Sequence, residues 1–267
     1  MNFSRPGSMG TVIFIGAGPG AADLITVRGA ARMALADVVL FDALTDPALR
    51  AHAPHAKWVD VGKRGFCDST GQTTINALLV KHASEVDVVV RLKGGDPSIF
   101  GRLEEELEAL AEAGIGCEIV PGVTAATAAA AATQRPLTRR GHGRSVSLTT
   151  AMTREGQLQA TRTADTEVFY MAGKQLAALS RRLLAAGWPE DTPVSVVSRA
   201  GWPDQLHSDH TAASLARAAM LHAGRPSVVT VGAGAATLRS VWLAASPKIT
   251  ASPAFGPRPL HTTRASP

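Results

Sequence analysis

Residues 11–21 read TVIFIGAGPGA, and they give the clearest local indication of the fold class. Its first five residues are mostly β-branched and apolar, which is typical of a buried strand, and the glycines that follow favour a tight turn. Apolar residues then recur on one helical stripe through 23–35. The order strand, glycine loop, helix is the beginning of an α/β fold.

The same alternation of strand-like and helix-like segments continues along most of the chain. We expect further strands at 37–41, 59–61, 87–92, 118–120, 145–149, 167–171, 193–197 and 227–231. We expect further helices at 73–83, 103–113, 124–133, 176–186 and 212–221. Strands that alternate with helices predict an α/β architecture with largely parallel sheets.

The composition of the sequence changes at 135–144, between two halves of alternating strands and helices. This segment, RPLTRRGHGR, is basic and poor in apolar residues, so we expect a linker or an active-site loop. The prediction is one α/β domain at 9–134, a second at 145–245, and a ligand site in the cleft between them. Residues 246–267 carry Pro, Ser, Thr and Arg without periodicity, which predicts a disordered tail.

Composition excludes several classes of protein. With 45% apolar residues the 267-residue chain is not intrinsically disordered, and no apolar run is long enough for a transmembrane helix. The N-terminus has no apolar segment of the kind found in secretory signals. The two cysteines, Cys67 and Cys117, are far apart and belong to no metal-binding cluster, so we expect free thiols, no metal and a cytoplasmic location.

Charge points to the class of ligand. The net charge of +5 favours an acidic partner. Aromatic residues make up only 4% of the chain, too few for a surface that stacks nucleic-acid bases. We therefore expect a polyanionic small molecule, and neither a nucleic acid nor a membrane.

Three glycine loops follow predicted strands. The first, GAGPGA at 16–21, fits a dinucleotide-binding fingerprint, with Asp42 at the end of the next strand where a ribose-binding acid belongs. This pattern keeps a nicotinamide or flavin oxidoreductase open, although Pro19 has no N–H to offer a pyrophosphate. The others are KGGDPSIFG at 93–101 and PGVTA at 121–125. All three fall where open α/β sheets bind ligands, at the carboxyl ends of strands.

In order and spacing, these segments resemble the tetrapyrrole methylases. The carrying motifs are VIFIGAGPG, DVVLFDAL, VGKR, TTIN, VVVRLKGGDPSIFGR, IVPGVTAATAAAA, RPLT, VFYMAG and VGAG, between residues 12 and 234. VGKR and RLKGGDP are most similar to the members that methylate uroporphyrinogen III. The resemblance implies two α/β/α domains with S-adenosylmethionine in the cleft between them, and a homodimer. It also implies two methyl transfers to uroporphyrinogen III, giving precorrin-2 for sirohaem, cobalamin or haem d1 synthesis.

The resemblance also implies roles for individual residues. Cofactor contacts carry over to Pro19, Gly94, Gly95, Asp96, Ile99, Thr124, Ala125, Met171 and Ala200. Asp42 is the candidate base, Lys63 the acid or carboxylate-orienting group, and Arg102 a further catalytic candidate. A polycarboxylate substrate calls for cations, and Arg64, Lys93 and Arg139 are the candidates.

Several positions depart from the family pattern. Ala43 stands where an arginine is usual, Leu103 and Glu104 where the family has glycines, and Arg139 where it has a histidine. Ser198 replaces an acidic residue. Most of these departures fall on the substrate side, so a different tetrapyrrole methylase, such as a precorrin methyltransferase, and an inactive cofactor-binding paralogue stay open as alternatives.

Overall fold

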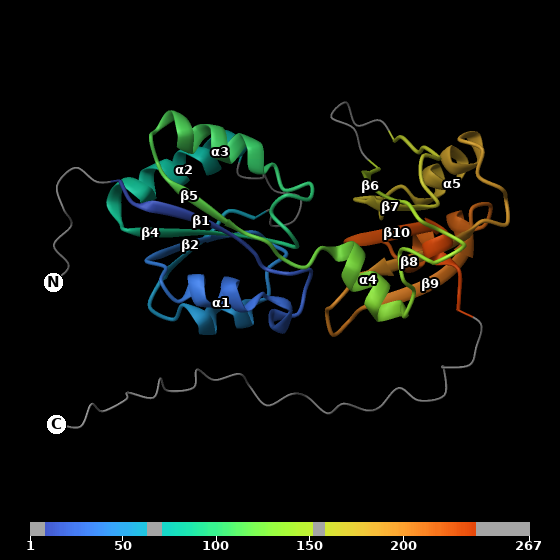
Figure 1. Cartoon of the computed structure of the whole chain (residues 1–267), viewed down its shortest axis with the longest axis horizontal. Helices are drawn as coiled ribbons and strands as arrows, with labels where there is room; N and C mark the ends of the chain where they lie inside the picture. Colours follow the sequence, from blue (N-terminus) through green and yellow to red (C-terminus); the bar gives the residue numbers. More distant parts are fainter. Residues whose placement is uncertain (1–8, 63–70, 152–157, 239–267) are drawn as a thin grey trace, which may run out of the picture. The chain divides into compact units, whose positions relative to one another are not determined.

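The computed structural model describes residues 9–62, 71–151 and 158–238. They form two five-stranded sheets with helices, so the predicted α/β class is confirmed (Figure 1). The described residues as far as Ala236 belong to one compact unit. The predicted boundaries at 134, 145 and 245 stay a prediction, and the predicted tail at 246–267 lies outside the described residues. No helix in the described ranges is both long and apolar enough to cross a bilayer.

The first sheet is entirely parallel. Its strands, in spatial order, are β3 (Lys57–Asp60), β2 (Val38–Phe41), β4 (Val88–Lys93), β1 (Thr11–Gly16) and β5 (Cys117–Val120). The parallel sheet predicted for this half is confirmed. Because β4 lies between β1 and β2, the order differs from the dinucleotide-binding arrangement, in which the first two strands are neighbours. The strand order therefore argues against the oxidoreductase alternative.

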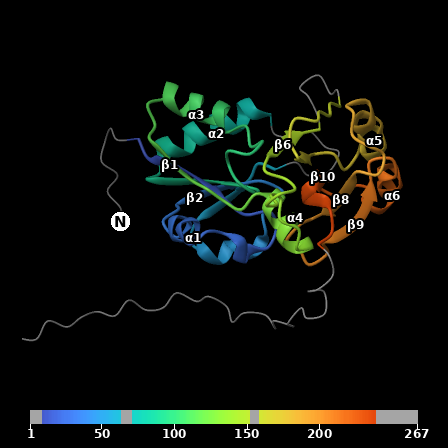
Figure 2. The same ribbon diagram turned by 45° about the vertical axis from the view of Figure 1, so that its right-hand side comes forward.

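Helices cover both faces of this sheet (Figures 1 and 2). On one face lie α2 (Gln72–Glu85) and α3 (Leu103–Glu112), and on the other α1 (Val27–Met33). The helix expected at 23–35 is shorter than predicted, because the side chain of Thr26 caps α1 by accepting a hydrogen bond of 3.0 Å from Gly29 N.

The second sheet is mixed. Its strands, in spatial order, are β6 (Val146–Thr150), β7 (Thr166–Tyr170), β10 (Ser227–Gly232), β8 (Pro193–Ser198) and β9 (Leu206–Thr211). Only β6 and β7 are parallel, so the prediction of a largely parallel sheet is wrong for this half. The edge strand β9 was not predicted because its sequence, LHSDHT, is polar and half-exposed. The helix expected at 212–221 is a 3-10 turn followed by the short α6 (Ala218–Leu221).

Helices also cover both faces of the second sheet. The leucines of α5 (Leu176–Ala185) are buried in its larger core. On the opposite face α4 (Ala125–Thr133) packs its alanines against Val168, Val197 and Val228. The predicted boundary at 134 assigns α4 to the first domain, yet its buried side chains lie on the second sheet. Alanines let this helix approach the strands closely, and its N-terminus begins beside the loops of the first sheet.

Candidate functional site

Glycines allow the loops that follow the strands of the first sheet to contact one another closely. β4, β1 and β5 are neighbours, so the loops that follow them leave the same edge. Gly18 and Gly95 have φ angles of +78° and +73° and exchange two N–H···O hydrogen bonds of 3.2 and 2.8 Å. A Cβ atom on Gly122 would stand 2.4 Å from the Gly95 oxygen and 2.7 Å from the Gly16 Cα. Only glycine allows three backbones to meet this closely.

Asp96 ties the second loop to the third. Its Oδ2 accepts a hydrogen bond of 2.8 Å from Gly122 N, and its Oδ1 accepts one of 2.8 Å from Ser98 N. The carboxylate is therefore fixed at the point where the loops meet.

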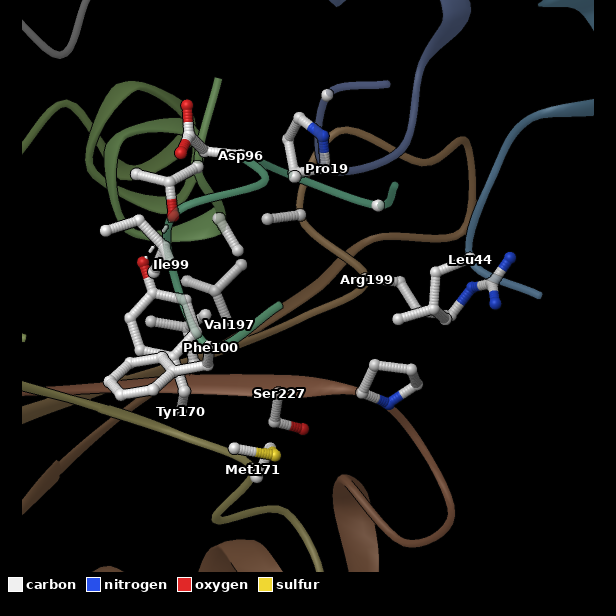
Figure 3. A pocket seen from close by; sticks show the side chains of 18 of the residues that line it. Pro19, Leu44, Asp96, Ile99, Phe100, Tyr170, Met171, Val197, Arg199 and Ser227 are labelled. Carbon is white, nitrogen blue, oxygen red and sulfur yellow. Dashed lines mark hydrogen bonds between the residues drawn. The ribbon is translucent and has the colours of Figure 1, made fainter. Parts of the chain in front are cut away.

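A pocket of about 260 Å³ opens at this point (Figure 3). Its walls come from the loops of the first sheet and from the adjoining parts of β7, β8 and β10 in the second. The residues predicted to contact the cofactor come from five separate segments, and every one of them lines this pocket: Pro19, Gly94, Gly95, Asp96, Ile99, Thr124, Ala125, Met171 and Ala200. The fold therefore brings together in one cavity positions that are dispersed in the sequence.

Tyr170 joins the two walls of the pocket, and the sequence analysis missed it. Its hydroxyl lies 2.6 Å from Thr124 Oγ1 and accepts a hydrogen bond of 3.2 Å from Ala126 N. Its ring packs against Phe100 with 5.1 Å between the ring centroids. It is the only tyrosine of the chain and directly precedes Met171, and this was the signal available in the sequence.

The pocket is lined by residues with uncommon backbone geometry. Phe100, Met171 and Arg199 have φ angles of 52°, 59° and 51°, in the left-handed region that non-glycine residues seldom occupy. Such conformations persist where surrounding contacts hold them, and they concentrate at binding sites. The pocket is therefore a built site and not an accidental gap in the packing.

A chain of buried and partly buried polar groups extends from the second wall. Ser227, which lines the pocket, lies 2.7 Å from Ser198 Oγ, and Ser198 Oγ lies 2.5 Å from His222 Nδ1. The Nε2 atom of His222 lies 2.8 Å from Ser208 Oγ, which lies 2.7 Å from His210 Nε2. Burial, and then the nearby charges, lower the pKa of His222 to about 4, so its ring is neutral near pH 7.

Comparison with known proteins identifies the family and the fold. The sequence profile of the tetrapyrrole (corrin/porphyrin) methylases matches residues 11–216. The chain belongs to the tetrapyrrole methylase family. Membership confirms the resemblance. It agrees with the order of strands in the first sheet, which differs from that of a dinucleotide-binding fold.

Individual members of the methylase family are similar over most of the chain. It is 42% identical over 228 residues to the uroporphyrinogen-III C-methyltransferase of Pseudomonas aeruginosa, covering 84% of this chain and 93% of that one. It is 45% identical over 199 residues to the siroheme synthase of Edwardsiella ictaluri, covering 73% of this chain and 43% of that longer protein. The uroporphyrin-III C-methyltransferase of Thermus thermophilus, solved in complex with S-adenosylhomocysteine, superposes with a TM-score of 0.73 at 32% identity, covering 84% of this chain and 97% of that one.

Beside the pocket of this methylase lies a buried ion network. Arg91 donates hydrogen bonds to Asp42 Oδ1 at 2.7 Å and to Glu106 Oε1 at 3.0 Å. Glu106 is fully buried and also accepts a hydrogen bond of 2.5 Å from Lys93 Nζ. Asp42, the candidate base, remains 31% exposed, with its carboxylate oriented by Arg91. Leu44, two residues further along the chain, lines the pocket, whereas Asp42 does not.

Lys93 requires a correction. The sequence analysis placed its charge against substrate carboxylates, but the side chain is only 3% exposed and is paired with Glu106. Burial and the adjacent Arg91 guanidinium lower the pKa of Lys93. Its ammonium group therefore faces the core of the first half and not the pocket.

Two other predicted cations, Arg102 and Arg139, are not among the residues that line the pocket. Arg102 is exposed and pairs with Glu105 through contacts of 2.7 and 2.6 Å. Arg139 donates a hydrogen bond to the backbone oxygen of Ala236, and burial together with Arg135 lowers the pKa of Arg139. Lys63 and Arg64 lie outside the described residues. In the described ranges there is no cluster of three or more His, Cys, Asp or Glu side chains that could hold a metal ion.

Proposed function

We propose that this chain is an S-adenosylmethionine-dependent methyltransferase that methylates uroporphyrinogen III twice and forms precorrin-2. The observation that carries the proposal is the convergence of nine predicted cofactor positions on one pocket. The choice of acceptor is supported by the 42% identity to the Pseudomonas aeruginosa uroporphyrinogen-III C-methyltransferase over nearly its whole length.

The chemistry of the pocket fits this cofactor. A Cβ atom on Gly95 would meet no other atom within 4 Å, so the loop backbone is open to a ligand. Ile99, Val197 and Met171 offer apolar surface for a nucleoside base, while Asp96 and Thr124 offer oxygen atoms for hydroxyl and amino groups. When bound, S-adenosylmethionine supplies an electrophilic methyl group.

Asp42 is the proposed base. Transfer of the methyl group from the sulfonium to a substituted pyrrole carbon leaves a cationic macrocycle. The macrocycle must then lose a proton from another of its atoms, and a carboxylate within reach can accept that proton. Arg91 holds the Asp42 carboxylate just after β2, and the Asp42 side chain remains 31% exposed. Lys63 is assigned as the acid or carboxylate-orienting group and Arg102 as a further catalytic group. Arg64 and Arg139 are assigned as substrate contacts, with Lys93 withdrawn.

The proposal is tested by anaerobic incubation of the purified protein with S-adenosylmethionine and uroporphyrinogen III, followed by mass spectrometry of the tetrapyrrole. A doubly methylated product is expected. An unmodified tetrapyrrole together with intact binding of S-adenosylhomocysteine would point to a different acceptor or an inactive paralogue. Absence of S-adenosylhomocysteine binding in calorimetry would reject the proposal.

We also propose a cytoplasmic homodimer that serves sirohaem, cobalamin or haem d1 synthesis. The family resemblance supports the dimer, and the free thiol of Cys117 agrees with a reducing compartment. Light scattering coupled to size-exclusion chromatography would give the mass in solution, and a monomeric mass would reject the dimer.

A further inference from the structure

Trp202 connects the two walls of the pocket. Its side chain lines the cavity, and its indole Nε1 donates a hydrogen bond of 3.0 Å to the backbone oxygen of Pro19, 183 residues away in the sequence. A Cβ atom on Gly20 would stand 2.3 Å from Trp202 Cδ1, so the glycine lets the indole lie directly on the first loop. Pro19 itself is one of the pocket residues, which places this hydrogen bond at the rim of the site.

The Arg199 guanidinium packs on the Trp202 ring and is itself held by Asp204. The Arg199 guanidinium carbon lies 4.1 Å from the centre of the Trp202 ring, and Arg199 Nε donates a hydrogen bond of 2.7 Å to Asp204 Oδ1. Arg225 Nη1 donates a hydrogen bond of 2.8 Å to the backbone oxygen of Asp204. The loop between β8 and β9 therefore presents a preformed aromatic side chain to the first sheet, and the left-handed φ of Arg199 is part of this arrangement.

The same local arrangement occurs at two other tryptophans of the described ranges. The Trp58 indole donates to Ala53 O at 3.1 Å under Arg50, and the Trp188 indole donates to Thr161 O at 2.8 Å under Arg162. Those hydrogen bonds span 5 and 27 residues, and neither tryptophan lines the pocket. Like Trp202, each donates an indole hydrogen bond to a backbone oxygen and lies under an arginine, but neither lies at the pocket. They therefore serve as matched controls.

We infer that Trp202 is a positioning residue for the cofactor. Its hydrogen bond to Pro19 sets the spacing between the loop wall of the first sheet and the wall formed by the second sheet. A ligand that contacts both walls binds tightly only when that spacing is held, because a loose pocket must be ordered at the moment of binding. This inference rests on the proposed function, since it takes S-adenosylmethionine and its product as the ligands.

The test compares W202F with W188F. Phenylalanine keeps an aromatic ring and removes the N–H donor in both variants. We expect W202F to weaken S-adenosylhomocysteine binding by about 3- to 10-fold in calorimetry, the usual effect of one lost hydrogen bond. W188F is expected to change that affinity by less than about 2-fold, even where it lowers the melting temperature as much. In turnover assays W202F should raise KM for S-adenosylmethionine and leave KM for the tetrapyrrole unchanged.

Fluorescence distinguishes a tryptophan that contacts the ligand site from one that only stabilises the fold. The triple variant W58F/W188F/W242F leaves Trp202 as the only indole of the chain. Its emission should change when S-adenosylhomocysteine is added, because the ligand enters a cavity that the indole lines. This measurement keeps the inference testable even where W202F does not fold.

The outcomes separate the two hypotheses. Equal S-adenosylhomocysteine affinity in W202F and W188F, or an unchanged emission in the single-tryptophan variant that binds the ligand, would overturn the positioning role and leave the proposed function intact. Wild-type protein that does not bind S-adenosylhomocysteine would overturn both, since Trp202 would then have no such ligand to position.

Discussion

Stability should depend on pH through one buried histidine behind the pocket. His222 has no exposed surface, and both of its ring nitrogens are engaged by serine hydroxyls. Its pKa is lowered from 6.5 to about 4, first by burial and then by His210, Arg225 and His207. Below pH 6.5 the unfolded chain therefore binds a proton at this residue that the folded protein does not, and stability falls as the pH falls toward 4.

The size of the effect follows from the two pKa values. Each pKa unit corresponds to 1.36 kcal/mol, so the full difference would reach about 3 kcal/mol near pH 4. At pH 5 the free energy of unfolding should be about 2 kcal/mol lower than above pH 7, because of His222 alone. The substitution His222→Gln removes the titrating group and keeps a polar side chain of similar length.

The assay is urea unfolding of wild type, H222Q and H55Q at pH 8 and pH 5. His55 is exposed and serves as the control. We expect wild type and H55Q to lose about 2 kcal/mol more than H222Q between these pH values. If all three proteins lose the same amount, the histidine is not buried in its neutral form and the argument fails.

Three further substitutions test the site. Gly122→Ala should lower the free energy of unfolding by about 2 kcal/mol, because the added Cβ would meet backbone atoms. Gly71→Ala has open space around its Cβ and should leave the free energy of unfolding unchanged. Equal effects of the two substitutions in urea unfolding would contradict the loop contact. Glu106→Gln leaves the buried Lys93 without its carboxylate and leaves Arg91 with Asp42 alone. It should lower the free energy of unfolding by about 3 kcal/mol in the same assay, against less than about 0.5 kcal/mol for the exposed Glu108→Gln. Asp42→Asn should lower kcat by about 100-fold or more and leave S-adenosylhomocysteine affinity unchanged; wild-type turnover would exclude Asp42 as the base.

The sequence predicts the first half of the fold well because its strands are short, apolar and separated by glycine loops. Buried parallel strands such as VIFI and DVVVRL stand out by composition, and their order along the chain locates the ligand-binding edge. The second half was harder to predict. The antiparallel pairing of β8 with β9 depends on a polar edge strand, and neither hydropathy nor periodicity marks such a segment.

The pocket was predictable and the groups behind it were not. Glycine, proline and threonine at strand ends are visible as motifs, and the family resemblance supplies their roles. The pairing of Lys93 with Glu106 could not be predicted, because only the packing of α3 brings Glu106 to 2.5 Å from the Lys93 ammonium group. Trp202 was hidden for a similar reason, since its partner Pro19 is remote in sequence. Side-chain pairing across long separations is decided by tertiary packing, about which a local pattern carries no information.

The position of β10 in the second sheet has a consequence for the order in which the protein is made. The five strands of the first sheet have all been synthesised by Val120, so that sheet can assemble while the ribosome is still translating the rest. The second sheet cannot, because β10 is the last strand of the described chain and takes the central place between β7 and β8. Until residues 227–232 emerge, β7 and β8 each expose an unpaired edge, and the nascent chain lacks the wall formed by Pro226, Ser227 and Val228. The pocket is therefore incomplete until this last strand is inserted, and the interval before its insertion is the stage most exposed to misassembly.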